Sequence, residues 1–306
     1  MKRAAGAVGS RFDYVTVGHV TIDVLADGTR RPGGSAFYSA VQAARLGART
    51  AILTRGVPAE IEAALEPYLG EFELLVEPAH RTTRLATTWA GPIRNQRVLA
   101  WAGQVSAVEV DAALLHLAPV AQEIAAEWRE ASADFIGLTP QGLARAWGGE
   151  GGQMRLAPAE EDARELALRC DALVLSEDEL ASCAALFDAA VGTGASVAIT
   201  AGASPTKLFA HGLAVELDVL DIGEAIDDLG AGDVFAAAFF IALAEGQGPA
   251  SAAAFAHAAA ALRVSGRGAQ AIAARAAIDE RARVDSREAE SRRAERGRTG
   301  RGRADP

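Results

Sequence analysis

Short runs rich in β-branched residues alternate along this 306-residue chain with longer runs of helical periodicity. This alternation constrains the fold more than any single motif, because it is typical of a mostly parallel sheet covered by helices on both faces. Strands are predicted at 13–18, 48–54, 72–76, 113–117, 133–138, 171–175, 196–200 and 206–210. Helices are predicted at 35–46, 58–69, 120–130, 160–169, 177–187, 231–245 and 249–265.

Two segments interrupt the alternation, residues 19–32 and 82–103. The second contains two extended runs, TRLATTWA and QRVLAWAG, around the turn-forming sequence GPIRN. Both segments fit a small β-flap outside the main sheet. Such a flap could cover a site or be only a loop excursion, because a short extended pair is marginal unless it packs on something.

The composition excludes several classes of protein. Half of the residues are hydrophobic, which rules out a wholly disordered chain. The longest apolar run, at 234–244, is too short to cross a bilayer, and no apolar stretch of a secretory signal follows the first residues. Cys170 and Cys183 alone cannot build a disulfide framework. The net charge of −10 argues against nucleic-acid binding. We therefore expect a cytoplasmic protein with neither nucleic-acid nor membrane partners.

The last 28 residues differ from the body in composition. Residues 279–306 contain nine arginines and seven acidic residues, with hardly any apolar residue after Val284. Such a segment cannot bury itself. The sequence therefore predicts one folded domain at 13–278, followed at 279–306 by a charged tail that is disordered beyond a fraying helix end.

The strongest local signal is the heptapeptide DDLGAGD, which runs from Asp227 to Asp233 and leads directly into an apolar helix. Small residues allow a tight turn, and a helix that begins there directs amide groups and its positive dipole end toward an anion. Asp233 would then be placed to accept a proton from an attacking hydroxyl. Taken alone, the motif fits equally well with a capping aspartate beside turn glycines.

A second group of residues lies near the first strand. Gly33 and Gly34 open the helix SAFYSAVQAARLGA, and glycines at such a position let a ligand lie on the backbone. Asp23 follows the first strand, near the sheet edge where open α/β folds bind ligands. Its carboxylate could accept two hydroxyl hydrogen bonds, although an isolated aspartate in a loop is often a turn former.

Taken together and in this order, these motifs resemble those of the ribokinase-like, or PfkB-type, carbohydrate kinases. The resemblance covers residues 13 to 275 and includes DDLGAGD, SGRGAQ at 265–270, PGGSAFYSA at 32–40, VLSEDE at 174–179 and ITAG at 199–202. It implies a three-layer α/β/α sandwich with a mostly parallel sheet and a small β-lid. It also implies a kinase that uses ATP and Mg²⁺, and the pairing of lids in the family implies a homodimer.

The resemblance assigns roles to individual residues. Asp233 would be the catalytic base, and Gly230, Ala231 and Gly232 would form the anion hole. Glu179 would help to hold Mg²⁺ through water, and Asp227 would lie near a site for a monovalent cation such as K⁺. The nucleotide would be lined by Ser176, Thr200, Gly202, Gly230, Gly232, Gly266 and Gly268, and the substrate hydroxyls by Asp23, Gly33, Gly34 and Tyr38.

Three positions depart from the family pattern. Tyr38 and Ser176 stand where the family has asparagine, and Asp228 stands where it has threonine. Tyr38 weakens the case for ribose as substrate, Ser176 changes the Mg²⁺ environment, and Asp228 adds a carboxylate beside the cation site. Asp233 and its three small neighbours match the pattern, so the chemical step is expected to be preserved.

The segment DFIGLTPQGLARAW and the flap are similar to the inositol-kinase branch of the family. The resemblance makes Gln141 and Arg145 candidate polyol contacts, and the flap offers Arg94 and Arg97. We therefore expect an ATP-dependent phosphotransferase acting on a hydroxyl of a small sugar or cyclic polyol, with myo-inositol the leading candidate. The alternatives are a nucleoside kinase of the same fold, with Trp89 and Trp101 as a base slot, and a catalytically weak sensor that binds a sugar or nucleotide.

Overall fold

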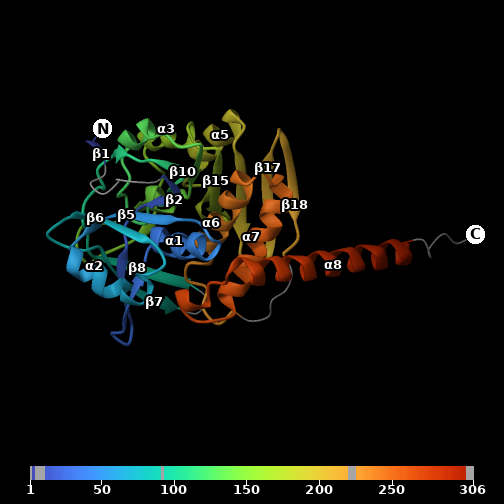
Figure 1. The fold of residues 1–306 in the computed structure, drawn as a ribbon, viewed down its shortest axis with the longest axis horizontal. Coiled ribbons are helices and arrows are strands. Elements are labelled where there is room, and N and C mark those ends of the chain that lie inside the picture. The colour runs from blue at the N-terminus through green and yellow to red at the C-terminus, as the bar shows by residue number, and fades with distance from the viewer. Residues whose placement is uncertain (1, 4–10, 91–92, 220–224, 301–306) are drawn as a thin grey trace, which may run out of the picture.

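The parallel sheet that the sequence predicts forms the centre of the molecule (Figure 1). A computed structural model describes residues 2–3, 11–90, 93–219 and 225–300, and within these ranges nine strands form one sheet in the order β18-β17-β16-β15-β11-β10-β2-β5-β6. The strands from β16 to β6 pair in parallel, whereas β16, β17 and β18 pair antiparallel. Their bounds are β2 Phe12–Val17, β5 Thr50–Gly56, β6 Glu73–Pro78, β10 Ala112–Leu117, β11 Phe135–Leu138, β15 Ala172–Ser176, β16 Ser196–Ala201, β17 Ser204–Ala210 and β18 Leu213–Leu217.

Helices cover both faces of this sheet. Along β2, Tyr14 belongs to the core under one set of helices, while Val15 and Val17 belong to the core under the other, as the two-residue period of a strand requires. The first set comprises α1 Ser35–Arg45, α6 Ala231–Ala244, α7 Pro249–Val264 and the start of α8 Arg275–Gly300, and the second α3 Arg164–Ala167 and α5 Ala184–Thr193. The predicted α/β/α sandwich is confirmed.

The remaining elements are short. They are α2 Pro58–Leu65, α4 Glu177–Leu180, the two-residue pair β1 Lys2–Arg3 and β9 Val108–Glu109, and 3₁₀ turns at Glu66–Tyr68, Ala126–Glu130, Pro140–Ala144, Glu161–Ala163 and Ala269–Ala271. The helix predicted at 160–169 is therefore a 3₁₀ turn that continues directly into α3, and the helix predicted at 177–187 is broken into α4 and α5. Within the described part of the chain, no helix has both the length and the apolar character that a membrane span needs.

The two interruptions of the alternation form a lid, as the sequence predicts. In the described ranges, a second sheet has the strand order β13-β8-β7-β3-β4. Its strands are β3 Thr21–Leu25, β4 Arg30–Gly33, β7 Arg84–Ala90, β8 Ile93–Ala100 and β13 Gly152–Gln153. Gly91 and Pro92 of the predicted turn lie outside the described residues. The strand β13, and the pair β12 Arg145–Ala146 and β14 Arg155–Leu156 beside it, were not predicted, because two-residue strands leave no periodic pattern.

The helix predicted at 120–130 is wrong. The chain is irregular there until the 3₁₀ turn at Ala126, and Gln122 has a positive φ of 57°. The cause is Glu123, whose fully buried carboxylate accepts the backbone amides of His19 (2.7 Å), Val120 (2.8 Å) and Ala121 (2.6 Å). A side chain that captures amides in this way competes with the helical hydrogen bonds.

The described part of the charged tail is helical. Helix α8 continues through residues 279–300 and projects past the edge of the body (Figure 1). Ion pairs along the helix surface, between Arg281 and Asp285 (2.7 Å) and between Arg283 and Glu280, provide a local reason for helix without burial. Residues 301–306 lie outside the described residues.

Replacing Glu123 with alanine should destabilise the protein. The change leaves three amides in the interior without their charged acceptor, and a hydrogen bond to a charged group contributes about 1.5–3 kcal/mol. We expect a loss of at least about 2 kcal/mol in the free energy of unfolding, measured by urea denaturation. Glu127→Ala, at an exposed position four residues on, should stay within about 0.5 kcal/mol of the wild type. Equal stability of the two variants would contradict this role of Glu123.

Candidate active site

One cavity of about 690 Å³ lies between the lid and the ends of the parallel strands. The lid contributes Asp23 at one end, and β15 and β16 contribute Ser176 and Thr200 at the other. The first turn of α6, with Asp233, lines the same space. Segments that were predicted to bind the substrate, to bind the nucleotide and to carry the catalytic base therefore line one cavity.

The turn before α6 has the geometry that its small residues predict. Gly230 has φ +82°, and a Cβ there would lie 2.4 Å from the ring of Tyr38, so a side chain is excluded twice over. The Ala231 amide donates to the Asp228 carbonyl (3.1 Å), and Gly232 follows in the first helical turn, where the helix offers its amides no acceptor. Of the three residues predicted for the anion hole, Ala231 thus has its amide bonded within the turn, and Gly232 lies where the helix leaves amides without an acceptor.

Asp233 lies half-buried in that first turn, and a buried polar chain extends from behind it. The Ser39 hydroxyl donates to the Asp233 carbonyl (3.2 Å). Deeper in the core, the Tyr14 hydroxyl is 2.6 Å from His116 Nδ1, and His116 Nε2 is 3.0 Å from Thr139 Oγ1. Burial lowers the pKa of His116 to about 3, so its imidazole is neutral. Burial also raises the pKa of Tyr14, and a hydrogen bond with Ser39 acts in the opposite direction. This hydrogen bond links Ser39 to the chain formed by Tyr14, His116 and Thr139.

At the lid end, Asp23 is only 2% exposed and still lines the cavity. Thr21 Oγ1 donates to its Oδ1 (2.8 Å), and a Cβ on Gly33 would lie 2.5 Å from its Oδ2. Gly34 has φ +95°, and a Cβ there would meet the His19 carbonyl at 2.1 Å. Gly34 lines the cavity as predicted, whereas Gly33 lies outside the described lining and acts by leaving room for the carboxylate.

The other predicted substrate contacts divide in the same way. Tyr38 and Gln141 line the cavity, as does Arg145, which is 7% exposed and donates to the Val120 carbonyl (3.0 Å). Burial, the largest influence, raises the pKa of Tyr38 well above its usual value, so the phenol stays protonated. Arg97 is exposed and donates to the Gly151 carbonyl (2.9 Å), outside the described lining of the cavity. The side chain of Arg94 lies outside the described residues.

The opposite end of the cavity is lined by Ser176, Glu179, Thr200 and Gly202, the residues for which nucleotide or metal binding was predicted. Glu179 is 7% exposed, and its Oε2 accepts the Ser176 amide (2.9 Å), which fixes the carboxylate at the start of α4. Among the described residues no group of three or more His, Cys, Asp or Glu side chains is arranged as a metal site. A single fixed carboxylate suits Mg²⁺, which usually keeps several waters and binds one or two carboxylates together with substrate phosphates.

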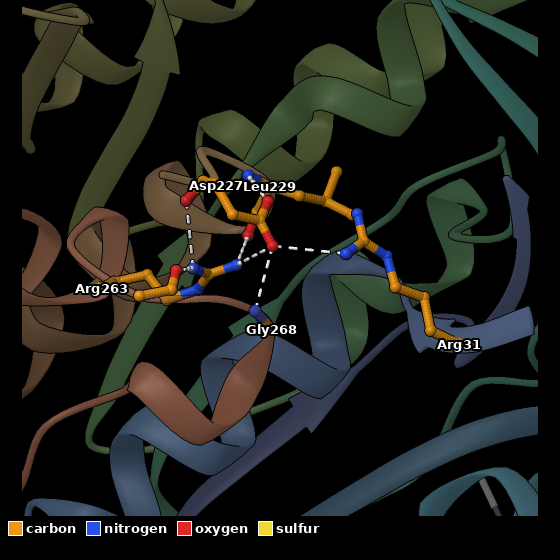
Figure 2. Close-up of polar contacts among 6 residues, drawn as sticks. Arg31, Asp227, Leu229, Arg263 and Gly268 are labelled. Atoms are coloured by element: carbon orange, nitrogen blue, oxygen red, sulfur yellow. Dashed lines mark hydrogen bonds and ion pairs between the residues drawn. The ribbon is translucent and has the colours of Figure 1, made fainter. Parts of the chain in front are cut away.

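Asp227 is held differently from its prediction. Figure 2 shows its carboxylate between two guanidinium groups, with Oδ2 3.3 Å from Arg31 and 3.4 Å from Arg263. The Gly268 amide donates to the same oxygen (3.0 Å) and the Leu229 amide to Oδ1 (3.1 Å). Burial opposes ionisation, but these donors and charges outweigh it, so the pKa of Asp227 lies below its usual value. Two arginines therefore stand where the resemblance implied an inorganic cation.

The glycines predicted for the nucleotide belong to this same cluster. The Gly266 carbonyl accepts from Arg263 (3.1 Å), and the Gly268 amide binds Asp227. Both lie outside the described lining of the cavity.

Several residues of the lining were not predicted from the sequence. They include Gln96 of the lid, Thr206 of β17, and Met154 and Leu156 beside the short strands of 145–156. Gln96 and Thr206 lie in segments that were predicted as extended, but none of the four belongs to a motif that would mark it as part of a site. Phe235 and His257 also line the cavity and pack edge to face, with ring centroids 5.0 Å apart.

Residues 80–276, about two thirds of the chain, match the model of the pfkB family carbohydrate kinases. The chain belongs to this family. The protein is therefore a sugar kinase by family, and the recognition made from its motifs is confirmed.

Solved structures of this kinase family have the same fold. A nucleoside kinase from Methanocaldococcus jannaschii is 18% identical, over 90% of this chain and 99% of that one, with a TM-score of 0.71. A pyrophosphate-dependent myo-inositol-1 kinase converted into a myo-inositol-3 kinase is 19% identical, over 89% and 99%, with a TM-score of 0.69. Arabidopsis thaliana ribokinase, complexed with ribose and ATP, is 18% identical, over 89% and 99%, with a TM-score of 0.66. No curated protein matches the chain in sequence.

Adding a methyl group at Gly230 should impair the kinase more than the same change at a comparable glycine. Gly246 has φ +87° at the end of α6, but a Cβ there meets nothing within 4 Å. Gly246→Ala therefore reports left-handed strain alone, about 1–2 kcal/mol in unfolding free energy. Gly230→Ala adds the collision with Tyr38, and we expect a larger loss of stability and at least a tenfold loss of kcat. Similar effects of the two variants would show that the contact with Tyr38 is unimportant.

Proposed function

We propose that this kinase transfers the terminal phosphoryl group of ATP to a hydroxyl of a small cyclic polyol, with myo-inositol the first candidate. One observation carries the proposal: a single cavity contains a buried carboxylate at the lid end, Asp23, and a carboxylate at the start of α6, Asp233. The first can hold hydroxyl groups, and the second can accept a proton from one of them.

The chemistry needs little from the protein beyond position and charge. Asp233 takes the proton of the acceptor hydroxyl, whose oxygen attacks the terminal phosphorus while the bond to the leaving diphosphate oxygen breaks. Charge on the transferring group is stabilised by the Gly232 amide and the positive end of the α6 dipole. The ADP product keeps the electron pair of the broken bond.

The charges around the cavity support a role for a divalent cation. Its described lining includes five carboxylates and two guanidinium groups, the carboxylates being Asp23, Asp178, Glu179, Asp228 and Asp233 and the guanidiniums Arg145 and Arg155. A triphosphate entering this space would be repelled without compensation. Bound Mg²⁺ would neutralise phosphate charge, and Glu179 is the fixed carboxylate placed to hold it through water. One ribokinase-fold neighbour is described in complex with ATP and Mg²⁺.

The choice of a polyol over a nucleoside is supported by the lid. Asp23 and Gly34 offer a carboxylate and close backbone approach, which suit a ring with adjacent hydroxyls. Trp101, which sequence analysis considered for a nucleoside base, packs on Trp147 (6.0 Å between ring centroids) and donates to the Ala121 carbonyl (2.7 Å). The side chain of Trp89 lies outside the described residues. Among the structural neighbours, one pyrophosphate-dependent enzyme is named a myo-inositol-1 kinase, and a pyrophosphate-dependent kinase is described in complex with myo-inositol. Association through the lid and a cytoplasmic location stay predictions.

Asp233→Asn should abolish turnover and leave ATP affinity nearly unchanged. An amide cannot accept the hydroxyl proton, and loss of a positioned base costs about 10²–10⁴-fold in rate. The measurement is ADP release by the purified variant over inositols, hexoses, pentoses and nucleosides, with ATP binding measured by calorimetry. Asp188→Asn, an exposed change on α5, is the matched control. Near wild-type turnover by Asp233→Asn would show that another group is the base.

Asp23→Ala should raise KM for the acceptor without changing KM for ATP. Leaving ligand hydroxyls unpaired in a closed site costs about 1–3 kcal/mol each, or roughly ten- to a hundredfold in affinity. The control is Asp27→Ala, which removes an exposed carboxylate from the same lid. Equal shifts of both KM values, or a screen in which only nucleosides release ADP, would overturn the assignment of a polyol acceptor to this end of the cavity.

A further inference from the structure

A completely buried arginine holds the loop that leads to the catalytic turn. Arg263, at the end of α7, has no exposed surface. Its guanidinium donates to the carbonyl oxygens of Asp227 (3.1 Å), Gly266 (3.1 Å) and Leu229, and it is ion-paired with the Asp227 carboxylate (Figure 2). Four oxygens from two separate segments of the chain thus converge on one cation.

Burying this charge costs desolvation free energy, so its position in the core needs a physical explanation. A buried charge normally needs a partner of its own, yet the Asp227 carboxylate is shared with Arg31 from the lid. The cluster therefore contains two guanidinium groups and one carboxylate and has a net charge of +1. It lies at the start of the segment 227–233, whose other end is Asp233.

The guanidinium also lies against the support of the anion hole. Its central carbon is 5.5 Å from the centre of the Tyr38 ring, within the range of a cation–π contact. The same ring fills the space where a Gly230 side chain would stand. Arg263 thus contacts the turn on two sides, through the carbonyls of residues 227 and 229 and through Tyr38.

We propose that Arg263 is a positioning residue that acts as a built-in cation. Its guanidinium gathers backbone oxygens that could otherwise bind an inorganic monovalent ion, in the way that rings of carbonyls replace the hydration shell of an ion. It fixes the turn from Gly230 to Asp233 and adds positive charge behind the site of the transferred phosphoryl group. The enzyme is therefore independent of added monovalent cations. The proposal rests on the phosphotransferase activity proposed above.

The first test uses the wild-type enzyme. ADP release is measured at constant ionic strength with K⁺, Na⁺ or tetramethylammonium as the sole monovalent cation. Because the guanidinium already fills the oxygen cluster, kcat should agree within about twofold across the three salts. A strong requirement for K⁺ or Na⁺ would overturn the proposal.

The second test removes the guanidinium group from the oxygen cluster. In tetramethylammonium salt, Arg263→Ala should lose at least tenfold in kcat, and millimolar guanidinium or K⁺ should restore a large, saturable part of it. Arg45→Ala is the control, because Arg45 donates to the carbonyls of Ala269 (2.9 Å) and Ile272 (2.7 Å) in the neighbouring segment without contacting 227–233. Its kcat should not respond to either cation. If Arg263→Ala folds but neither cation restores its kcat, Arg263 has only a structural role and the proposal is wrong.

Melting temperature separates this proposal from the proposed function, since it needs no substrate. Guanidinium or K⁺ should raise the melting temperature of Arg263→Ala relative to tetramethylammonium, and should leave that of the wild type unchanged. If no acceptor is phosphorylated by the wild type, the proposed function fails while this shift still reports the cation site. If Arg263→Ala does not fold in any salt, the wild-type salt series decides alone.

Discussion

The carboxylate of Asp227 is the point at which the lid, the sandwich and the turn before α6 are joined. Arg31 comes from the lid strand β4, Arg263 from the end of α7, and the Leu229 amide from the turn itself. An ion pair of this kind is worth most where it is partly removed from water, as here. Any movement of the lid away from the body must break the contact with Arg31, so the position of the lid and the geometry of the turn are physically coupled.

The fold could be predicted from the sequence wherever a local pattern decided the structure. All eight predicted strands of the central sheet are present within a few residues of their predicted bounds, because most of them are short, largely apolar runs between turn signals. The helix expected at 120–130 does not form because the Glu123 carboxylate accepts backbone amides. One of these amides belongs to His19, which is 104 residues away in the sequence. No local pattern reports such a contact. The edge strand β18 was also missed, although its sequence LAVEL is largely apolar, and in the structure it is exposed along most of its length.

The site could be predicted only in part, for the same reason. Asp233, Asp23 and Gly34 could be placed at the cavity because they belong to motifs at strand or helix ends. The pairing of Asp227 with Arg31 could not be predicted, because the two residues are 196 positions apart in the sequence. Arg97 was proposed from its place in the flap, but the direction of a flap side chain depends on the register with β13, which its sequence does not reveal.

The neutral imidazole of His116 has a consequence for how the enzyme responds to acidity. The polar chain from Thr139 through Tyr14 lies under both the catalytic turn and the segment that holds Gln141. With a pKa of about 3 for the histidine, and a raised one for the tyrosine, this chain keeps one protonation state throughout the neutral range. The scaffold beneath the reacting groups is thus a fixed set of dipoles, and a titration seen in the rate would belong to the groups that face the cavity.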